Sequence, residues 1–599
     1  MNKTICLLII FINSHLIIAQ TLSNDEIDRQ IKLVENNLSG RVRISEKGYN
    51  LEDRMKFYNV KGLSLAVIHD YKIVWAKGYG WADEKEKRPV TIKTLFQAAS
   101  NSKSLNGMAI LKLAQDQKIN LYTDINTYLK SWQFPYDSIS KNKKITLADL
   151  LSHTSGIKVI NFPGYSRKEK IPSITQILDG KKPSNTPAVS SEYEPGKKFQ
   201  YSGIGTTITR LLVSDVTNRA YDEFMYENIL HPLGMDSSFF TQPPPKNKLK
   251  QLATGYRING NEVENKFRVY PEQGPDGLWT TPTEMAAFVN EIMLAFAGKS
   301  EKILNQEMTK LMLSPYRNES PGLGVFVQQR GKARYFTHGA GNEGFGGQYF
   351  GSFTGGNGVV VYVNSDSREI INEVINSVAF IYKWEDFFDT TVRKVIVPAD
   401  SICKKYVGVY VLDDKLATVF KNGNDYYYKT NNDNLKMYFT SDSSFFNMES
   451  LSDKTFKIDS LGKVTGISRM GFGIKYSPLK KLQNPDTLHL KNFEFGSLAW
   501  EFFENKKYTE CIEYCKRGLE LYPNDDGLLS KMAHAYLFNG NYDKAIGVYG
   551  TQLKTIWTPN KILEKNMQQS VVYFKESGYD VKIFEKVFKD LKIKLPKGY

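Results

Sequence analysis

A serine and a lysine stand three residues apart, as Ser100 and Lys103, in the stretch FQAASNSKSLNGMAIL at the start of an apolar run. Two interpretations fit this spacing. Ser100 could be the N-cap of a helix with Lys103 directed outward, since serine is a favoured N-cap residue. Alternatively, Ser100 could be a nucleophile whose proton is accepted by a neutral lysine. The spacing alone does not decide between them because it recurs elsewhere, for example at Ser138/Lys141.

The residues that follow Lys103 favour the nucleophile hypothesis. Apolar side chains occur on nearly all sides of the helix expected over Leu105–Lys118, so this helix should be central and buried. Lys103, one turn after Ser100, should then lie in the same partly dry pocket. Burial lowers the pKa of a lysine from its usual value of about 10.4, which would leave a neutral amine able to accept the serine proton.

The surrounding pattern predicts an α/β (α+β) domain with an antiparallel sheet over residues 22–394. Leu63–Ile68 and Lys72–Ala76 alternate like two antiparallel strands joined by a short turn. Gly355–Asp366 is a valine-rich run typical of another strand, and stretches between these strands, such as Thr206–Thr217, are helical in pattern. We therefore expect one sheet with a helical region inserted between its early and late strands.

Residues 397–482 predict a second, smaller domain. They contain short alternating runs separated by turn residues, and Asn422-Gly423 is typical of a type I′ hairpin. The pattern indicates a small all-β sandwich or β-barrel.

Residues 490–599 predict a third, α-helical region. They repeat with a period of about 34 residues, which aligns Ala499 with Ala533 and Tyr508 with Tyr542. This period resembles the tetratricopeptide repeat, and an unrelated pair of helical hairpins is the alternative. Two or three such repeats are marginally stable alone, so we expect them to pack on the β domain and to offer a surface for a protein partner.

The N-terminus is typical of a secretory signal peptide over residues 1–19. One early lysine precedes an apolar run from Ile5 to Ile18, and small Ala19 precedes polar Gln20, where cleavage is expected. A membrane anchor is the alternative, but the run is short and contains polar residues. No later segment is long and apolar enough for a membrane span, so the mature protein is predicted to be periplasmic or secreted.

Composition argues against several functional classes. The formal charge of +15 comes from lysines spread along the chain, which favours a solvated basic surface over a nucleic-acid groove. The seven histidines are scattered and no HExxH or paired CxxC motif occurs, so neither a metal site nor another cofactor is expected. Cys511 and Cys515 are one helical turn apart, a spacing that suits side-by-side packing better than a disulfide.

Eight segments add a resemblance to these observations. In chain order they are GLSLAVIHDYKIVWAKGYG, FQAASNSKS, LYTDINTYL, ITLADLLSHTSGI, EPGKKFQYSGIGTTITRLL, LGMDSSFF, GPDGLWTTPTEMAAFV and FTHGAGNEGFGGQYF. Together they resemble the class C β-lactamase-like serine hydrolases, a family that includes penicillin-binding DD-peptidases and esterases. The resemblance covers about residues 45–385 and implies a serine β-lactamase/DD-peptidase-like domain that acts on peptides or small molecules.

The resemblance implies roles for three motifs. The family's Ser-x-x-Lys falls on Ser100 as the nucleophile and Lys103 as the proton acceptor. Its Tyr-x-Asn falls on Tyr201-Ser202-Gly203, where Tyr201 would shuttle protons. Its Lys-Thr-Gly falls on His338-Gly339-Ala340, and the backbone N–H of Gly341 would complete an oxyanion hole with that of Ser100. A structural aromatic at Tyr201 and a strand-capping His338 are the alternatives.

Two departures from the family pattern bear on specificity. Gly203 replaces an asparagine that would hold an amide of the substrate. His338 replaces the lysine of true β-lactamases, which weakens the positive charge available to a substrate carboxylate near neutral pH. A peptidase or esterase is therefore expected rather than an antibiotic-degrading enzyme. His153, in SHTSGI, lies beside two serines, but we interpret this segment as a structural turn.

The sequence thus predicts a serine hydrolase that forms an acyl-enzyme with D-amino-acid peptides or small esters. The alternative is a non-catalytic sensor or scaffold resembling a penicillin-binding protein, whose repeats bind a protein partner. The joint presence of Ser100, Lys103 and Tyr201 favours the enzyme.

Overall fold

A computed structural model of the chain divides it into two compact units, Met1–Lys394 and Val395–Tyr599. The structure describes residues 23–40, 42–44, 47–159, 162–387, 391–412, 415–430, 433–448, 450–471, 474–481, 492–504, 506–523, 525–554 and 560–593. The predicted signal peptide lies outside these residues. Both modules predicted after residue 394 fall within the second unit.

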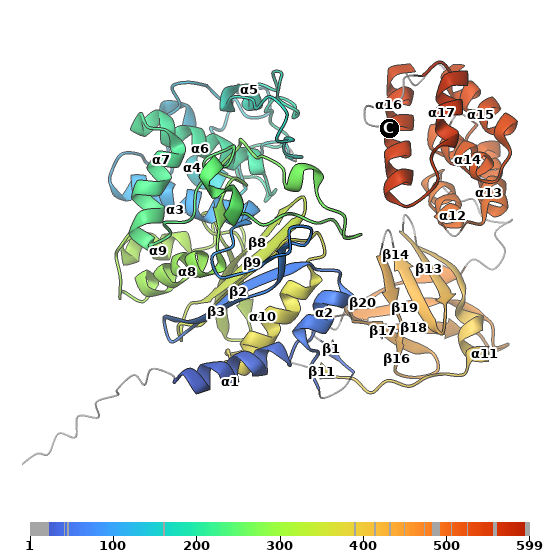
Figure 1. Cartoon of the computed structure of the whole chain (residues 1–599), viewed down its shortest axis with the longest axis horizontal. Coiled ribbons are helices and arrows are strands. Elements are labelled where there is room, and N and C mark those ends of the chain that lie inside the picture. Colours follow the sequence, from blue (N-terminus) through green and yellow to red (C-terminus); the bar gives the residue numbers. More distant parts are fainter. Residues whose placement is uncertain are drawn as a thin grey trace, which may run out of the picture. The chain divides into compact units, whose positions relative to one another are not determined.

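The first unit contains a seven-stranded antiparallel sheet in which early and late parts of the chain meet (Figure 1). In spatial order the strands are β4 (Arg88–Pro89), β3 (Lys72–Asp83), β2 (Gly62–His69), β10 (Gly358–Val363), β9 (Phe345–Ser352), β8 (Ala333–Asn342) and β7 (Phe326–Arg330). Strand β2 pairs with the late strand β10, with Val67 opposite Val359. This confirms the predicted sheet with a helical region inserted between its early and late strands.

Alternate residues of the central strands enter two separate cores, as the two-residue repeat of a strand requires. On β10, Val359, Val361 and Val363 belong to one core, whereas Val360 and Tyr362 belong to the other. Burial on both faces explains why the strand reads as a continuous apolar run rather than an alternating one.

Helices cover both faces of the sheet (Figure 1). The core containing Val359 is closed by α1 (Asn24–Glu35), α2 (Leu51–Phe57) and α10 (Glu369–Ile381). The opposite core includes residues of α3 (Ser102–Gln115), α4 (Leu147–Leu151), α5 (Ile174–Leu178), α6 (Gly203–Thr217), α7 (Tyr221–Met225), α8 (Pro282–Phe296) and α9 (Gln306–Met312). Two short pairs, β5 (Phe96–Gln97) with β6 (Trp279–Thr280) and β1 (Val42–Arg43) with β11 (Thr391–Val392), lie outside the main sheet.

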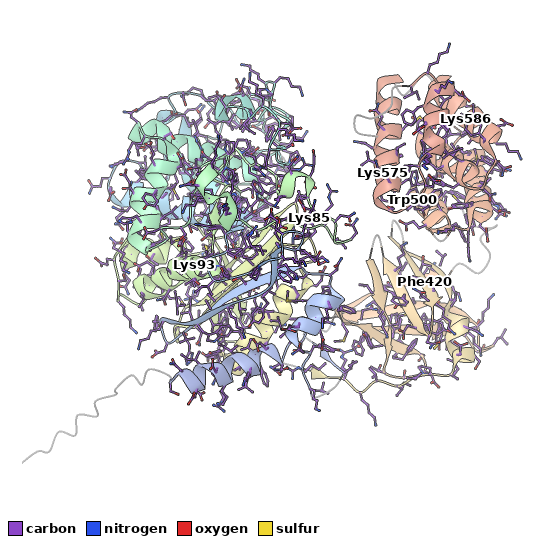
Figure 2. The ribbon with its side chains drawn as sticks, viewed as in Figure 1. Lys85, Lys93, Phe420, Trp500, Lys575 and Lys586 are labelled. Carbon is purple, nitrogen blue, oxygen red and sulfur yellow. The ribbon has the colours of Figure 1, made fainter. Side chains whose placement is uncertain are left out.

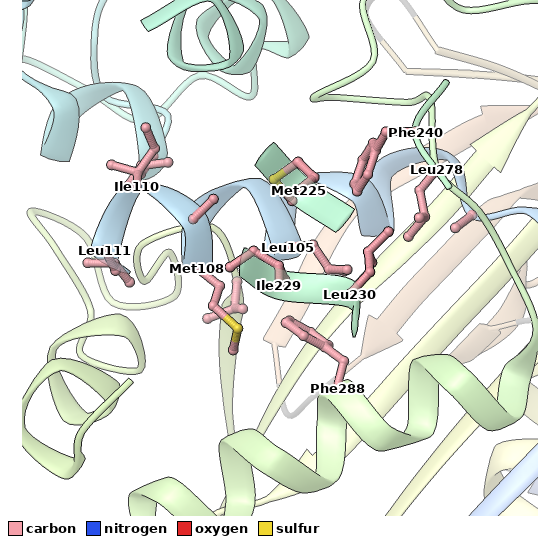
Figure 3. Close-up of a cluster of buried hydrophobic side chains, with 14 of the residues drawn as sticks. Leu105, Met108, Ile110, Leu111, Met225, Ile229, Leu230, Phe240, Leu278 and Phe288 are labelled. Carbon is pink, nitrogen blue, oxygen red and sulfur yellow. The ribbon is translucent and has the colours of Figure 1, made fainter. Parts of the chain in front are cut away.

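Helix α3 is enclosed on all sides, which confirms the prediction from its apolar pattern. Its residues from Ser102 to Leu111 are all buried. Figure 3 shows the contacts of its first three turns, where Leu105 and Met108 lie among side chains that include Ile229, Leu230 and Phe288. The helix begins three residues before the predicted Leu105 and ends before Lys118.

The second unit begins with α11 (Asp400–Cys403) and one nine-stranded antiparallel sheet. In spatial order its strands are β15 (Asp433–Lys436), β14 (Asp425–Thr430), β13 (Lys415–Asn422), β12 (Gly408–Leu412), β20 (Ile474–Lys481), β19 (Val464–Gly471), β18 (Ser450–Ile458), β17 (Ser444–Asn447) and β16 (Tyr438–Phe439). The predicted hairpin is present, with Gly423 at a φ of 60° between the paired residues Asn422 and Asp425. The Asn447 side chain on β17 donates a hydrogen bond of 2.8 Å to the Lys436 carbonyl at the end of β15.

In the described part of this unit, helices follow the sheet: α12 (Asn492–Glu504), α13 (Tyr508–Leu521), α14 (Asp526–Phe538), α15 (Tyr542–Lys554), α16 (Asn560–Glu576) and α17 (Ile583–Asp590). The starts of α12 and α13 recur at the predicted spacing in α14 and α15, and Ala499 and Ala533 are both fully buried. Cys511 and Cys515 are buried free thiols, as predicted from their spacing.

Lysines are distributed over separate elements in both units. Figure 2 labels Lys85 and Lys93 in the first unit and Lys575 and Lys586 in the second, and all four are exposed. The observed distribution fits a solvated basic surface. Within the described part of the chain, no helix has the length and apolar character needed to cross a bilayer.

Candidate active site

Ser100 lies in a short 3₁₀ turn, Ala99–Asn101, immediately before α3. Asn101, and not Ser100, is the N-cap residue of α3, so the N-cap interpretation of Ser100 is wrong. Ala99 has a φ of 42°, a strained value for a residue with a Cβ atom. Such strain is often kept where it holds a functional side chain in place.

The three residues predicted to act together are in direct contact. Lys103 Nζ and Tyr201 Oη each donate a hydrogen bond of 2.9 Å to Ser100 Oγ. Tyr201 reaches this position from the segment just before α6. The chain therefore brings together a hydroxyl, an amine and a phenol around one oxygen, the set of groups that serine acyl transfer requires.

Lys103 is buried, but its pKa does not fall as the sequence predicted. Its side chain is 3 % exposed, and Nζ also donates to the Pro275 carbonyl at 2.9 Å and to Asp276 Oδ1 at 3.4 Å. Burial disfavours the ammonium, but the neighbouring Asp276 carboxylate and Tyr201 oxygen outweigh it and raise the pKa of Lys103 above its usual value. The prediction of a neutral lysine is wrong because a carboxylate contacts it.

Asp276 is the residue of this site that sequence reasoning missed. Its Oδ1 accepts a hydrogen bond of 3.2 Å from Ser100 Oγ. A Pro-Asp-Gly sequence usually signals a turn, so its pattern gave no reason to assign a role to the carboxylate. The short pairing of β5 with β6 places this turn beside Ser100.

The His153 segment is a turn, as predicted, and it supports Tyr201. His153 has a φ of 58°, and its Nδ1 accepts a hydrogen bond of 3.2 Å from the Ser202 backbone N–H. Its ring lies 4.5 Å from the Tyr201 ring. Burial and the nearby Lys103 charge hold the pKa of His153 well below its usual value, so this histidine is a neutral packing group.

His338 lies behind Tyr201 rather than in the open part of the site. It is 3 % exposed, its ring lies 6.1 Å from that of Tyr201, and its Nδ1 hydrogen-bonds the Gly339 carbonyl at 2.7 Å. Burial and the Lys103 charge lower the pKa of His338 to about 3. The histidine is therefore neutral near pH 7 and supplies no positive charge to a substrate.

The strand that carries His338 continues past Ser100 along the edge of the site. β7 pairs with β8 only as far as Thr337, and the Asn101 amide donates to the His338 carbonyl at 2.8 Å. Gly339 is exposed, and a Cβ added to it would meet nothing within 4 Å. A Cβ at Gly341 would lie 2.3 Å from the Arg368 guanidinium, so glycine is needed there for this arginine to approach the strand.

Ser100, Lys103, Tyr201 and Gly341 line one cavity of about 470 Å³. Two further lining residues, Phe162 and Arg368, were not found by sequence reasoning. A Cβ at Gly203 would lie 2.6 Å from the Phe162 ring, so this ring fills the space into which the family's asparagine would project. Arg368 places a charged guanidinium in the cavity, whereas the neutral His338 supplies no charge.

A buried helix under an antiparallel sheet, with serine, lysine and tyrosine in mutual contact, defines the class of serine acyl-transfer hydrolases. A family model described as Beta-lactamase matches residues 50–375, more than half of the chain. The chain belongs to this Beta-lactamase family of serine hydrolases.

Individual curated relatives are similar to only part of this chain. Protein flp of Staphylococcus aureus (strain N315) is 29 % identical over 266 residues, which are 44 % of this chain and 46 % of that protein. A putative D-alanyl-D-alanine carboxypeptidase of Escherichia coli (strain K12) is 27 % identical over 235 residues, 38 % of this chain and 53 % of that protein. The chain thus spans about half the length of the curated relatives it matches.

Solved structures also resemble this chain over part of its length. The D-amino acid amidase from Ochrobactrum anthropi SV3 has a TM-score of 0.48 and 20 % identity, covering 60 % of this chain and 98 % of that one. The octameric penicillin-binding protein homologue from Pyrococcus abyssi has a TM-score of 0.46 and 19 % identity, covering 72 % of this chain and 98 % of that one.

Proposed function

We propose that the protein is an exported serine hydrolase that cleaves D-amino-acid peptides or small esters through an acyl-enzyme on Ser100. The observation that carries this proposal is the contact of Ser100 Oγ with both Lys103 Nζ and Tyr201 Oη at 2.9 Å. The cavity of about 470 Å³ beside these atoms is large enough for a short peptide or ester.

In this proposal Ser100 Oγ attacks the carbonyl carbon of an amide or ester. The backbone N–H groups of Ser100 and Gly341 stabilise the oxyanion, and groups that contact Oγ move the protons. The leaving group departs, and a water molecule then hydrolyses the acyl-enzyme. Lys103, as a buried ammonium, would also stabilise the negative charge that develops near Oγ.

The substrate class is proposed from the charges in the cavity. Arg368 Nη2 donates to the Asn342 carbonyl at 2.9 Å, and its guanidinium lies beside Gly341. A guanidinium at that position suits a substrate with a free carboxylate, such as the end of a D-amino-acid peptide. The similarity to a putative D-alanyl-D-alanine carboxypeptidase supports the same class.

Reaction with an active-site probe tests the proposal. Purified protein is treated with a fluorophosphonate and, separately, with a fluorescent penicillin, alongside Ser100→Ala. We expect labelling of the wild type and none of the variant. Absence of Ser100-dependent labelling by either probe would instead favour the sensor or scaffold alternative.

Substrate comparison then separates the enzyme classes. A D-Ala-D-Ala peptide, a p-nitrophenyl ester and a chromogenic cephalosporin are compared by kcat/KM. We expect the peptide or the ester to be preferred, and for the peptide Arg368→Ala should raise KM more than it lowers kcat. Preferential turnover of the cephalosporin would contradict the proposed substrate class.

Export and partner binding complete the proposal. The apolar run before Ala19 supports secretion, and N-terminal sequencing of protein recovered from the periplasm or medium would test cleavage after this residue. The matching spacing of α12–α13 and α14–α15 supports tetratricopeptide-like repeats that bind a protein partner.

A further inference from the structure

Asp276 contacts the proposed nucleophile itself, which a Ser–Lys–Tyr set does not require. Among the residues that the structure describes, Ser100 Oγ has three polar side-chain neighbours: Lys103 Nζ and Tyr201 Oη at 2.9 Å, and Asp276 Oδ1 at 3.2 Å. A protonated amine only donates hydrogen bonds, and an ionised carboxylate only accepts them. Because Lys103 and Tyr201 both donate to Oγ, the serine's own hydrogen points at Asp276.

The fold holds this carboxylate opposite Ser100 by backbone pairing. β5 pairs with β6 in antiparallel register, with Gln97 opposite Trp279. Ser100 lies three residues after Gln97, and Asp276 lies three residues before Trp279. Because the strands are antiparallel, both residues lie beyond the same end of this pairing. The Ala98 N–H donates to the Leu278 carbonyl at 2.9 Å, which continues the pairing towards the site.

The turn that carries Asp276 is fixed at several points. The Gly277 N–H donates to the Gln273 carbonyl at 2.7 Å, and the Asn342 amide donates to the Asp276 carbonyl at 3.3 Å. Lys103 Nζ donates to the neighbouring Pro275 carbonyl at 2.9 Å. Asp276 is 8 % exposed, so its carboxylate is held in place rather than solvated freely.

We propose that Asp276 is a further catalytic residue, which accepts the Ser100 proton while Lys103 stays protonated throughout acylation. This inference deepens the proposed function and rests on it. In the step, the Ser100 O–H bond breaks and the proton passes to Asp276 Oδ1. The Oγ electron pair forms the bond to the carbonyl carbon, and the carbonyl π pair moves to oxygen. The protonated Asp276 then returns this proton to the leaving nitrogen or oxygen as its bond to carbon breaks.

The charges around Asp276 are consistent with this assignment. Lys103 faces it from α3, and its pKa is raised by that carboxylate. Tyr201 and Tyr270 line the same cavity, as do Glu343 and Arg368. Glu343 is paired with Arg268 at 2.8 Å, and Arg368 faces Asp366 at 3.4 Å, so each of these charges has its own counter-charge. Glu272, just before this turn, interacts with Asp276, and the neutral His338 and His153 lie near the Lys103 charge.

Asp276 and a neutral Lys103, as alternative proton acceptors, predict opposite effects of Asp276→Asn. If Asp276 accepts the proton, its loss slows acylation. If a neutral Lys103 accepts it, loss of the carboxylate lowers the pKa of Lys103, enlarges the neutral fraction and speeds acylation near pH 7. One substitution therefore discriminates between the two schemes by the sign of its effect.

The experiment measures the rate constant of fluorophosphonate labelling and the burst of p-nitrophenyl acetate, from about pH 5 to about pH 9. We expect Asp276→Asn to label about 10²–10⁴-fold more slowly near pH 7. Asp276→Glu, which keeps the carboxylate, should label at least about tenfold faster than Asp276→Asn. Glu272→Gln is the matched control, since it makes the same carboxyl-to-amide change just before this turn, and it should label within a few-fold of wild type.

Outcomes separate the two proposals. A wild type that shows no Ser100-dependent labelling overturns the proposed function and this inference with it. A labelled wild type with an equally fast or faster Asp276→Asn overturns this inference alone. A thermal unfolding curve verifies that Asp276→Asn is folded. If it does not fold, Asp276→Glu decides, because a displaced base must change the labelling rate, and an unchanged rate overturns the assignment.

Discussion

Lys103 and Glu272 are both ionisable side chains buried in the first unit, and they contrast in what surrounds them. Lys103 Nζ contacts Ser100 Oγ, the Pro275 carbonyl and Asp276 Oδ1. By contrast, neither carboxylate oxygen of Glu272 has a hydrogen-bond partner from another described residue. Burial raises the pKa of Glu272 to about 8, and the charge of Asp276 adds to the shift.

The contrast shows that burial alone does not set the charge state of a group. Both residues are removed from water, which disfavours the charged form of each. Lys103 remains charged because a carboxylate lies beside it, whereas Glu272 is protonated near pH 7 because burial outweighs the hydrogen bond from its own backbone N–H. The charged residue belongs to the site, and the neutral one lies outside it.

The largest expected effect comes from removing the paired charge. Lys103→Met should slow acylation by up to about 10⁴-fold. It should also destabilise the protein by about 3–5 kcal/mol, because Asp276 then remains as a buried charge without its cation. Labelling rates and denaturant unfolding measure the two effects. A stable and active Lys103→Met would show that the pair is dispensable.

Removing the phenol should affect rate without affecting stability. Tyr201→Phe loses the hydrogen bond of 2.9 Å to Ser100 Oγ but keeps the ring that packs on His153. We expect acylation to fall by about 10²-fold. The unfolding free energy should change by less than about 1 kcal/mol, since the residue is 36 % exposed. An equal loss of stability and rate would indicate a structural role.

Replacing the buried carboxyl group of Glu272 by an amide should stabilise the protein, the opposite of Lys103→Met. Glu272 binds its proton in the folded state up to about pH 8, whereas the unfolded chain releases it near pH 4.5. Its contribution therefore falls as pH rises between these values. Glu272→Gln should gain on the order of a few kcal/mol over wild type near pH 8 and little near pH 4. Urea unfolding at both pH values tests this, and a gain independent of pH would contradict it.

The smallest effect concerns the residue that departs from the family pattern. Gly203→Asn places a Cβ atom 2.6 Å from the Phe162 ring in the wild-type geometry, so it should destabilise the protein by about 1–3 kcal/mol. Phe162→Ala should relieve this conflict in the double variant. Thermal unfolding of the two single variants and the double variant measures the coupling, and additive effects would exclude direct contact.

Much of the fold was predictable because it follows local patterns. The all-round apolar run after Lys103 predicted that α3 is buried, and Leu63–Ile68 and Lys72–Ala76 predicted β2 and β3. The spacing of Ala499 and Ala533 predicted where helices recur in the second unit. These signals depend on periodicity within a single element, which is encoded in neighbouring residues.

The sequence by itself determined which serine and lysine share the start of one buried helix, because their spacing and the apolar run lie on a single segment. Only the tertiary structure decided the chemistry around them. Asp276 lies 176 residues from Ser100 along the chain and meets it through the pairing of β5 with β6. A pKa depends on burial and on the nearest charges in space, so the raised pKa of Lys103 and the lowered pKa of His338 could follow only from contacts between distant segments.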